Sequence, residues 1–238
     1  MAHGTVKILA VLTVITLAAG VMTGEVAQAG KRGKHGKRGA VVVPAWVKSM
    51  TTRDTPVHGA RRPDLVVVEF SDYECPFCTR AHDNMLRVLK KYGKRIRFYY
   101  RHYPLDAACN TTLRSPMHRH ACLAARAAIC AHAQGRFWSF HDKLYRLKAT
   151  LSRAAILGLA TTVKLGRHKF RRCLISARTR RILQADLAAG NRAKLTGTPT
   201  FYAGGPDIKR FEFSSPRMKT FDSLFTLLDS QRNKPRPR

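Results

Sequence analysis

The order of its predicted elements indicates an α/β protein in which an all-helical insertion separates a β-α-β unit from a β-β-α unit. Three observations support this fold class. A buried strand over 65–70 leads into a helix, residues 107–195 carry helical patterns with no strand among them, and strand character returns at 200–203. A chain of 238 residues is long enough for one such domain with a large insertion.

The first half of the domain begins with a strand that is buried on both faces. Residues 64–70 read Asp-Leu-Val-Val-Val-Glu-Phe, which is β-branched and almost entirely apolar. After a short turn at 71–74, apolar residues recur at helical spacing over 75–92, and Gly93 ends the helix. Pro76 fits the first turn, because the backbone N–H that proline lacks has no helical partner there.

The same patterns place the remaining elements in order. Alternating residues over 95–103 predict a second strand, which Pro104 ends. Five helical patterns follow, at 121–130, 137–145, 153–159, 166–177 and 180–195. Strands at 200–203 and 208–213 form a hairpin around a glycine-rich turn, and a helix at 216–228 comes after them.

Three segments are expected outside this domain, which spans residues 55–230. Residues 1–29 contain an apolar run that ends in Ala-Gln-Ala, a pattern typical of a cleaved signal peptide; an uncleaved N-terminal anchor is the alternative. Residues 30–54 begin with a glycine-, lysine- and arginine-rich tract and are expected to form a flexible basic linker. Residues 231–238 are a basic tail. Export predicts a location in the periplasm or another extracytoplasmic part of the cell envelope.

The charge of the chain is extreme. Its 44 lysines and arginines face 14 aspartates and glutamates, for a formal net charge of +30. One interpretation is contact with an anionic surface of the cell envelope. The other is a general basic bias with no particular partner. Nucleic acid is the least favoured partner, because export argues against it and no nucleic-acid-binding motif is present.

Cys75 and Cys78 form a Cys-Pro-Phe-Cys motif where the first strand meets its helix. Two cysteines three apart on one helical turn can be a closed disulfide or two thiols, and the helix dipole favours a thiolate at the first of them. Half of a zinc site looks the same, but the other cysteines and histidines do not supply two further ligands at the required spacing. We therefore expect a redox-active disulfide with no metal site and no cofactor.

Three local motifs carry a resemblance to a known family. They are residues 68–78 (Val-Glu-Phe-Ser-Asp-Tyr-Glu-Cys-Pro-Phe-Cys), 134–142 (Gln-Gly-Arg-Phe-Trp-Ser-Phe-His-Asp) and 196–201 (Thr-Gly-Thr-Pro-Thr-Phe). On these motifs the chain resembles the DsbA-like thiol-disulfide oxidoreductases, which implies a thioredoxin fold interrupted by the helical insertion. The chain departs from the family in its high net charge. It also has Pro-Phe between the cysteines, where the strongest oxidants have Pro-His.

The resemblance assigns roles to the two cysteines and to Glu69. Cys75 is expected to be the exposed nucleophile and Cys78 the more buried resolving thiol, because a thiolate and not a thiol attacks a disulfide. Glu69 lies in an apolar strand six residues before Cys75, so burial should raise its pKa and let it move the proton of Cys78. The resemblance implies the same role. The alternative is a Glu69 that faces solvent at a sheet edge.

Further residues are assigned around the cysteines. The resemblance implies that the bond before Pro199 is cis, lies against the active-site disulfide and presents the backbone of Thr198 to an extended substrate. Without the resemblance, an ordinary trans proline at a strand start would be favoured. Pro76 and Phe77 are expected to contact substrates, although Phe77 could equally serve only in packing.

Four cysteines lie outside the motif, and the sequence alone allows three pairings among them. The resemblance implies a structural disulfide between Cys130 and Cys173 within the insertion, which leaves Cys109 to pair with Cys122. A second redox relay is the competing interpretation.

Together these expectations describe an exported dithiol oxidase that passes its Cys75–Cys78 disulfide to reduced or unfolded exported proteins. By resemblance, a quinone-linked membrane oxidase would reoxidise it. A reductase or isomerase with the same two cysteines is the enzymatic alternative, and the reduction potential separates the two. The non-enzymatic alternative is a basic envelope-binding protein on a thioredoxin scaffold.

Overall fold

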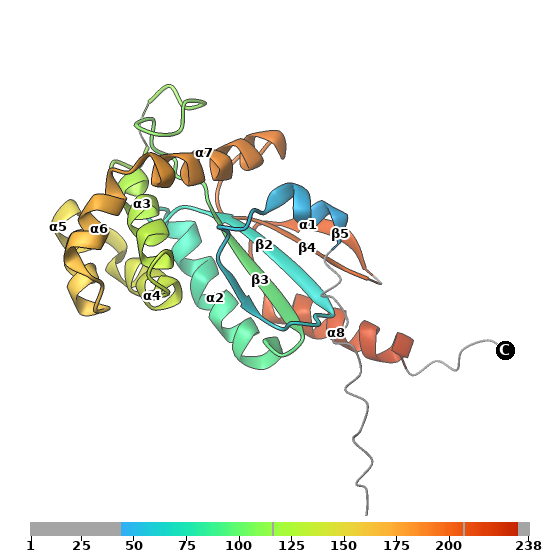
Figure 1. Ribbon diagram of the computed structural model, residues 1–238. Helices are drawn as coiled ribbons and strands as arrows, with labels where there is room; N and C mark the ends of the chain where they lie inside the picture. The colour runs from blue at the N-terminus through green and yellow to red at the C-terminus, as the bar shows by residue number, and fades with distance from the viewer. Residues whose placement is uncertain (1–43, 116, 207, 233–238) are drawn as a thin grey trace, which may run out of the picture. The chain divides into compact units, whose positions relative to one another are not determined.

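The computed structural model describes residues 44–115, 117–206 and 208–232 (Figure 1). The expected signal peptide, most of the expected linker and most of the basic tail lie outside the described residues. Among the residues that are described, no helix is both long enough and apolar enough to cross a lipid bilayer.

A five-stranded sheet in the order β1-β3-β2-β4-β5 forms the centre of the domain. Its strands are β1 (Val57–Gly59), β2 (Leu65–Ser71), β3 (Ile96–His102), β4 (Thr200–Gly205) and β5 (Ile208–Phe213). The central strand β2 pairs in parallel with β3 and antiparallel with β4. Every residue of β2 is buried, as its apolar sequence predicts for a strand covered on both faces. The two halves of the predicted fold therefore meet at β2.

Helices cover both faces of the sheet (Figure 1). These helices are α1 (Ala45–Met50), α2 (Pro76–Tyr92), α7 (Ala177–Arg192) and α8 (Met218–Arg232). On one face, Met85 of α2 and Phe221 of α8 join the apolar cluster that contains Val67 of β2. On the other face, Val47 of α1 and Leu187 of α7 join the cluster that contains neighbouring β2 residues. The two clusters are separate, because successive side chains of a strand point to opposite faces.

The all-helical insertion lies between β3 and β4, as the sequence predicts. Before α7 it contains α3 (Ala121–His132), α4 (Phe137–Leu147), a short 3-10 helix (Lys148–Thr150), α5 (Arg153–Thr162) and α6 (Arg167–Leu174). The central helix is α3, which contacts α4, α5, α6 and α7. Its alanines, including Ala124, Ala127 and Ala128, are buried, and their small side chains let the neighbouring helices approach closely. The Cys130–Cys173 disulfide joins α3 to α6.

Two elements differ from the sequence prediction. The expectation of a flexible linker over 30–54 is wrong at its end, because α1 forms there and Val47 is fully buried in the sheet core. A helix of six residues is too short to be stable alone, so tertiary burial forms it. The strand β1 lies before the first element that the sequence predicts, and its exposed residues pair with β3 at the sheet edge.

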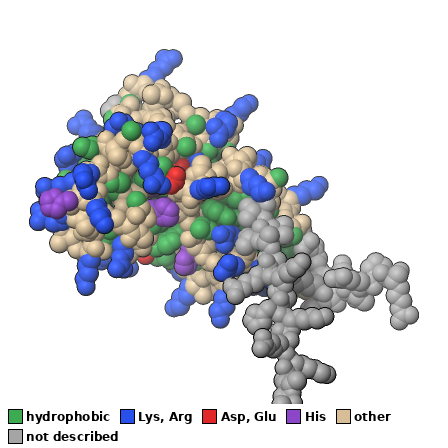
Figure 2. Space-filling model, in the orientation of Figure 1, with side chains coloured by type: hydrophobic (Ala, Val, Ile, Leu, Met, Phe, Trp, Pro, Cys, Tyr) green, Lys and Arg blue, Asp and Glu red, His purple; other side chains and the backbone are tan. Residues whose placement is uncertain are grey.

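The excess of lysine and arginine in the sequence is visible on the surface of the protein. Figure 2 shows Lys and Arg side chains distributed over the visible face of the molecule, with few acidic side chains between them.

Candidate active site

Cys75 and Cys78 lie at the start of α2, directly after the loop that leaves β2. Cys75 is the N-cap residue and Cys78 lies in the first turn, so both sulfurs lie at the same end of the helix. Both are free thiols. Cys78 is fully buried, as expected. The prediction of an exposed Cys75 is wrong, because Cys75 is only 4% exposed and the loop before β4 covers its sulfur.

The two thiols have opposite pKa shifts. The pKa of Cys75 falls from 9.0 to about 6, chiefly because the side chain of Cys78 hydrogen bonds to the thiolate; backbone N–H groups of Cys78 and Phe77 help, and burial opposes them. Burial raises the pKa of Cys78 well above its usual value, and the neighbouring Cys75 adds to this. At neutral pH, Cys75 is therefore the thiolate and Cys78 the thiol.

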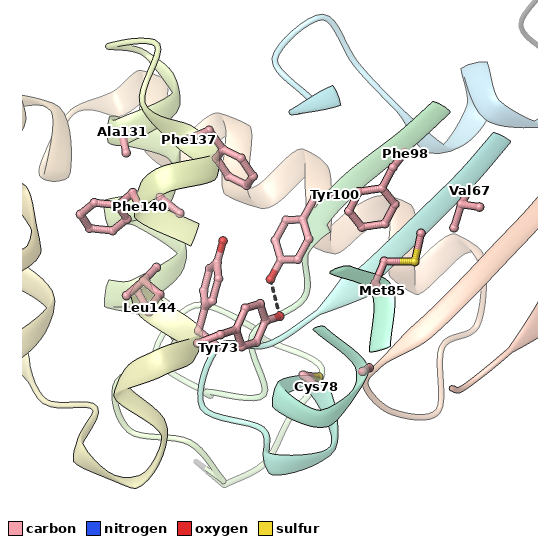
Figure 3. Close-up of a cluster of buried hydrophobic side chains, with 14 of the residues drawn as sticks. Val67, Tyr73, Cys78, Met85, Phe98, Tyr100, Ala131, Phe137, Phe140 and Leu144 are labelled. Carbon is pink, nitrogen blue, oxygen red and sulfur yellow. Dashed lines mark hydrogen bonds between the residues drawn. The ribbon is translucent and has the colours of Figure 1, made fainter. Parts of the chain in front are cut away.

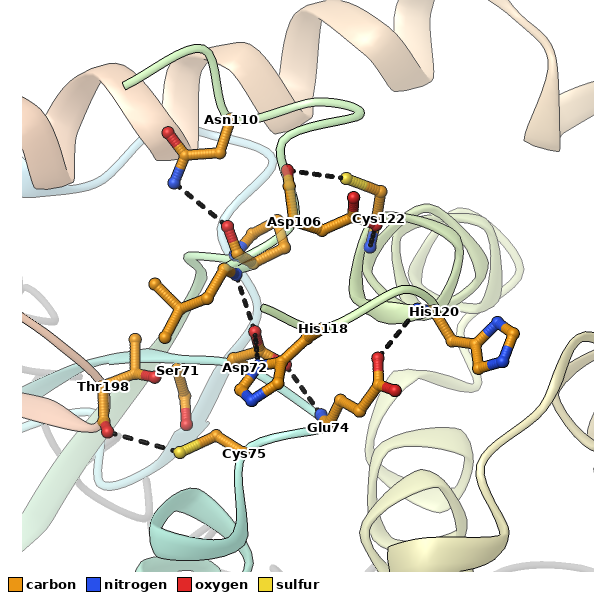
Figure 4. A network of polar contacts seen from close by, with 12 residues as sticks. Ser71, Asp72, Glu74, Cys75, Asp106, Asn110, His118, His120, Cys122 and Thr198 are labelled. Carbon is orange, nitrogen blue, oxygen red and sulfur yellow. Dashed lines mark hydrogen bonds and ion pairs between the residues drawn. The ribbon is translucent and has the colours of Figure 1, made fainter. Parts of the chain in front are cut away.

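The loop before β4 lies against the cysteines. The Thr198–Pro199 peptide bond is cis. The Cys75 Sγ lies 3.4 Å from the Thr198 carbonyl oxygen (Figure 4). A groove of about 540 Å³ runs beside this loop and is lined by Thr198, Pro199, Phe77 and Arg80, among others. Phe77 is 62% exposed, and the Arg80 guanidinium lies 4.6 Å from the centre of its ring.

Pro76 lies outside this groove. It lines a neighbouring hollow together with Glu74 and Thr79. The structure thus brings Phe77, Thr198 and Pro199 together in the groove, and Arg80 lines both this groove and the hollow that Pro76 lines.

Glu69 lies in the middle of β2 and is 2% exposed. It stands in register with Tyr100 of β3 and Phe201 of β4, so it is at the centre of the sheet and not at an edge. Burial raises its pKa from 4.5 to about 8, and a hydrogen bond with Ser71 opposes the shift. The carboxyl group is therefore protonated at neutral pH, as the strand pattern predicts.

Ser71 connects Glu69 with Cys78. It follows Glu69 by two residues on β2, so both side chains point to the same face. The Ser71 hydroxyl lowers the pKa of Glu69 and that of Cys78 by hydrogen bonding to their charged forms, and Glu69 Oε1 has no hydrogen-bond partner among the described residues. Its hydroxyl also lies 2.8 Å from the hydroxyl of Tyr145. The sequence analysis missed Ser71, although the period-2 pattern of the strand places it on the face of Glu69.

Aromatic side chains close over this polar group. The Tyr145 hydroxyl lies 3.0 Å from the Tyr100 hydroxyl, and the Tyr73 hydroxyl lies 3.0 Å from His141 Nδ1. Figure 3 shows Tyr73, Tyr100 and Cys78 in one apolar cluster. Because Tyr145 and His141 come from α4, the insertion forms one wall of the site.

Comparison with known proteins identifies the family. A model of the thioredoxin family matches residues 51–223, which include the cysteine motif, the insertion and the cis-proline loop. The chain belongs to this family. The resemblance to the DsbA-like thiol-disulfide oxidoreductases that the three motifs carry is confirmed.

The individual matches include one curated protein and two solved structures. A protein named Na(+)/H(+) antiporter NhaA 3, from Salinispora tropica, is 34% identical over 149 residues, which are 63% of this chain and 21% of that protein. The chain therefore spans only about a fifth of the length of this curated relative. A thioredoxin-like oxidoreductase from Silicibacter pomeroyi has a TM-score of 0.57 at 24% identity, covering 79% of this chain and 98% of that one. Wolbachia pipientis α-DsbA1 has a TM-score of 0.62 at 18% identity, covering 76% and 94%. These two structures share the fold.

In this thioredoxin-family protein, two acidic side chains fix the loop between β2 and α2 (Figure 4). Buried Asp72 accepts hydrogen bonds from the backbone N–H groups of Glu74 and Leu105 at 2.7 Å, and it lies 2.8 Å from His118 Nδ1. Glu74 accepts a hydrogen bond from the backbone N–H of His120 at 2.7 Å. The contact with Asp72 raises the pKa of His118. The segment after β3 thus holds the loop of the cysteine motif, which the sequence analysis did not predict.

The two structural disulfides have different places relative to this site. Cys109–Cys122 closes the segment that carries His118 and His120, which contact Asp72 and Glu74. Cys130–Cys173 lies within the insertion and does not touch the redox pair. Both pairings are those that the resemblance implies.

One cluster among the described residues could hold a metal ion. His82, His141 and Asp142 each offer one donor atom within 4.8 Å of the others. Burial lowers the pKa of His82 to about 4 and that of His141 well below its usual value, so both imidazoles are neutral at physiological pH. The expectation of no metal site rested on cysteine and histidine spacing and did not consider this cluster. None of the chemistry at Cys75 and Cys78 requires a metal.

Proposed function

We propose that this protein is an exported dithiol oxidase that introduces disulfides into reduced proteins through Cys75 and Cys78. The opposite pKa shifts of the two cysteines carry the proposal. A thiolate with a lowered pKa stabilises the reduced form of the pair, so reduction of the disulfide form is more favourable and that form acts as an oxidant. Membership of the family supports thiol-disulfide exchange. The stabilised thiolate of Cys75 favours a protein that oxidises its substrates over one that reduces them.

The proposed cycle begins when the thiolate of a reduced substrate attacks the Cys75 sulfur of the disulfide. A mixed disulfide forms, and Cys78 leaves as a thiolate. Glu69, protonated at neutral pH, supplies a proton to Cys78 through the hydroxyl of Ser71. A second substrate thiolate then attacks the substrate sulfur of the mixed disulfide and releases Cys75 as a thiolate. The substrate loses two electrons and the enzyme gains them, which returns the protein to its dithiol form.

The surroundings of the pair support unfolded exported proteins as substrates. The groove beside Thr198 and Pro199 is open, and exposed Phe77 offers an apolar contact to an extended chain. Two structural disulfides and the apolar N-terminal run support a location in the periplasm or another extracytoplasmic compartment. A quinone-linked membrane oxidase is the proposed reoxidising partner.

The redox equilibrium of the Cys75–Cys78 pair with glutathione tests the proposal. We expect a potential of about −180 to −120 mV, as for oxidising members of the superfamily, and not the roughly −270 mV of reducing thioredoxins. A potential near that of the reducing thioredoxins would make the protein a reductase. Release of native ribonuclease from its scrambled form, without an added oxidant, would instead indicate an isomerase.

Two substitutions test the assigned residues in the oxidation of a reduced model protein. Cys75→Ser should abolish the reaction. If the folded wild type itself does not oxidise the model protein, only the non-catalytic, envelope-binding alternative is left, and Cys75→Ser should not affect that binding. Glu69→Gln should slow the reaction, because the neutral amide cannot supply a proton to Cys78. An unchanged rate would remove the proposed role of Glu69 while leaving that of Cys75 intact.

A further inference from the structure

The helical insertion contains a cavity that the redox site does not use. It lies between α3, α5 and α6 and has a volume of about 670 Å³. Small-molecule sites commonly have volumes of about 300–1,000 Å³. None of the residues that line the cavity also lines the groove beside Thr198.

Part of the cavity wall is apolar. Phe170 of α6 is buried at its base, and Leu157 of α5 and Leu174 of α6 are half-buried along its sides. Ile175, directly after α6, lines the same cavity and is 75% exposed. These side chains would lose further apolar surface to water if a hydrocarbon ligand covered them.

The rest of the wall is cationic. Arg126 of α3, Arg153 of α5, and Arg167 and Arg171 of α6 line the cavity, and no acidic side chain does. Among the described residues, none of these four guanidinium groups has a hydrogen-bond or ion-pair partner. The Nε of Arg126 is buried and unpaired. By contrast, the two terminal nitrogens of the buried Arg101 donate hydrogen bonds to the Thr55 hydroxyl and to the Ala185 carbonyl. A buried polar group without a partner is costly, so Arg126 has a binding capacity that the chain itself does not satisfy.

The neighbouring sequence gives the same sign of charge. Between residues 143 and 185 the chain has twelve lysines and arginines and no aspartate or glutamate. Figure 2 shows such side chains over the part of the surface where α5 and α6 lie in Figure 1. A concave site lined by charges of one sign concentrates ligands of the opposite sign.

We propose that this cavity binds a single-chain amphiphile with an anionic head group, such as a long-chain carboxylate. The guanidinium groups would pair with the carboxylate, and the side chains of Leu157, Phe170, Leu174 and Ile175 would cover the hydrocarbon chain. A polyanion alone would leave the apolar wall in water. A purely apolar ligand would leave the four arginines unpaired. The ligand that satisfies both parts of the wall therefore carries both groups.

Calorimetric titration of the whole protein with dodecanoate tests the proposal. We expect saturable binding to one site, with affinity rising up to about fourfold for each CH₂ added from hexanoate to dodecanoate. Acetate and inorganic phosphate lack the chain, and the neutral detergent dodecyl maltoside lacks the charge, so each should bind at least tenfold more weakly. Equal binding of phosphate or of an oligonucleotide, without dependence on a hydrocarbon chain, would instead indicate a general cationic surface that binds any anion.

Paired variants locate the site. Arg167→Gln combined with Arg171→Gln removes two exposed cavity charges and should weaken dodecanoate binding at least tenfold. The control, Arg61→Gln combined with Arg62→Gln, removes two exposed charges elsewhere and should change binding less than twofold. Arg126→Gln should weaken binding as the cavity pair does. Unchanged thiol-disulfide exchange in all variants verifies their folding. Equal losses in the cavity pair and the control would overturn the proposal.

Discussion

At Cys75 and Cys78, two side chains of the same type behave differently because their surroundings differ. The thiolate of Cys75 receives hydrogen bonds from the thiol of Cys78 and from the helix start, whereas at Cys78 burial outweighs the hydrogen bonds with Ser71 and Thr198. The proton that the pair shares therefore stays on Cys78. Because of this asymmetry, Cys75 is the sulfur that attacks in the reduced protein and the sulfur that a substrate attacks in the disulfide form. The difference in pKa between the two cysteines can be measured.

The first prediction concerns the reactivity of Cys75 with a small alkylating reagent such as iodoacetamide. In the reduced protein, the rate of modification should rise through a midpoint near pH 6, because the reagent reacts with the thiolate. Cys78 should stay unmodified through this range. Mass spectrometry after proteolysis assigns the modified residue, and Cys75→Ser is the control. A midpoint above pH 8 would contradict the hydrogen-bonded thiolate.

The second prediction concerns Glu69 and the pH dependence of stability. Its pKa is about 8 in the folded protein and about 4.5 when unfolded, so between these values the folded state holds a proton that the unfolded state lacks. Stability that Glu69 contributes at low pH is therefore lost as the pH rises from 4.5 toward 8. By pH 7 the loss should reach roughly 3 kcal/mol.

Glu69→Gln removes this titration and isolates its effect. The free energy of unfolding, measured by urea denaturation of the oxidised protein, should favour the variant over the wild type by an amount that grows from pH 4.5 to pH 7. Because Asp186 and the other buried groups are present in both proteins, their titrations cancel in the difference. A difference that stays constant over this range would show that Glu69 is ionised in the folded state.

Periodicity and spacing found the residues of the site that lie on one stretch of chain, and the resemblance added Thr198 and Pro199. The Cys-x-x-C spacing identifies Cys75 and Cys78, and a lone acid in a buried strand identifies Glu69. Sequence reasoning did not find Asp72 or Tyr145. Tyr145 meets Ser71 across 74 residues of sequence, and Asp72 binds a segment that has no regular pattern. Such contacts depend on how elements pack, which periodicity does not report.

At the scale of elements, the insertion contributes a wall of the site as well as a separate helical bundle. Its α4 carries Tyr145 and His141 to the buried acid, while the alanine-rich α3 holds α4 against α5, α6 and α7. The long helices and the strands buried on both faces were predictable because their periodicity extends over many residues. The elements α1 and β1 were not, because they have six and three residues and exist through contacts with the sheet.

The third prediction compares the two structural disulfides. Removing Cys130–Cys173, with a sequence separation of 43, should lower the free energy of unfolding by about 4 kcal/mol, and removing Cys109–Cys122, with a separation of 13, by about 3 kcal/mol. Double Cys→Ser variants and urea denaturation measure both losses. Only the second variant should also slow thiol-disulfide exchange, because its loop holds Asp72 and Glu74 beside the redox pair. Equal exchange rates in the two variants would show that this loop does not position the motif.

At the scale of the whole molecule, the net charge exceeds what ion pairing can neutralise. With 44 basic and 14 acidic side chains, most cations have no acidic partner anywhere in the chain. Such a charge does not specify the fold, but it creates a positive potential around the molecule. The potential acts on the encounter with a substrate before any sulfur reacts, so it should appear as a preference among substrates.

The fourth prediction is that reduced peptides of acidic sequence are oxidised faster than matched basic peptides. At 10 mM salt, where the screening length is about 30 Å, the ratio of second-order rate constants should be about 10 or more; at 1 M salt, where it is about 3 Å, the ratio should approach 1. Stopped-flow measurements with peptides that share one cysteine-containing core give this ratio.

A variant of Arg80 tests whether a single charge at the groove causes the preference, since Arg80 lies over Phe77 there. Arg80→Gln removes one charge and should change the ratio little if the whole molecule produces it. A collapse of the ratio in this variant would assign the selectivity to the groove, and a ratio insensitive to salt would assign it to contacts other than charge.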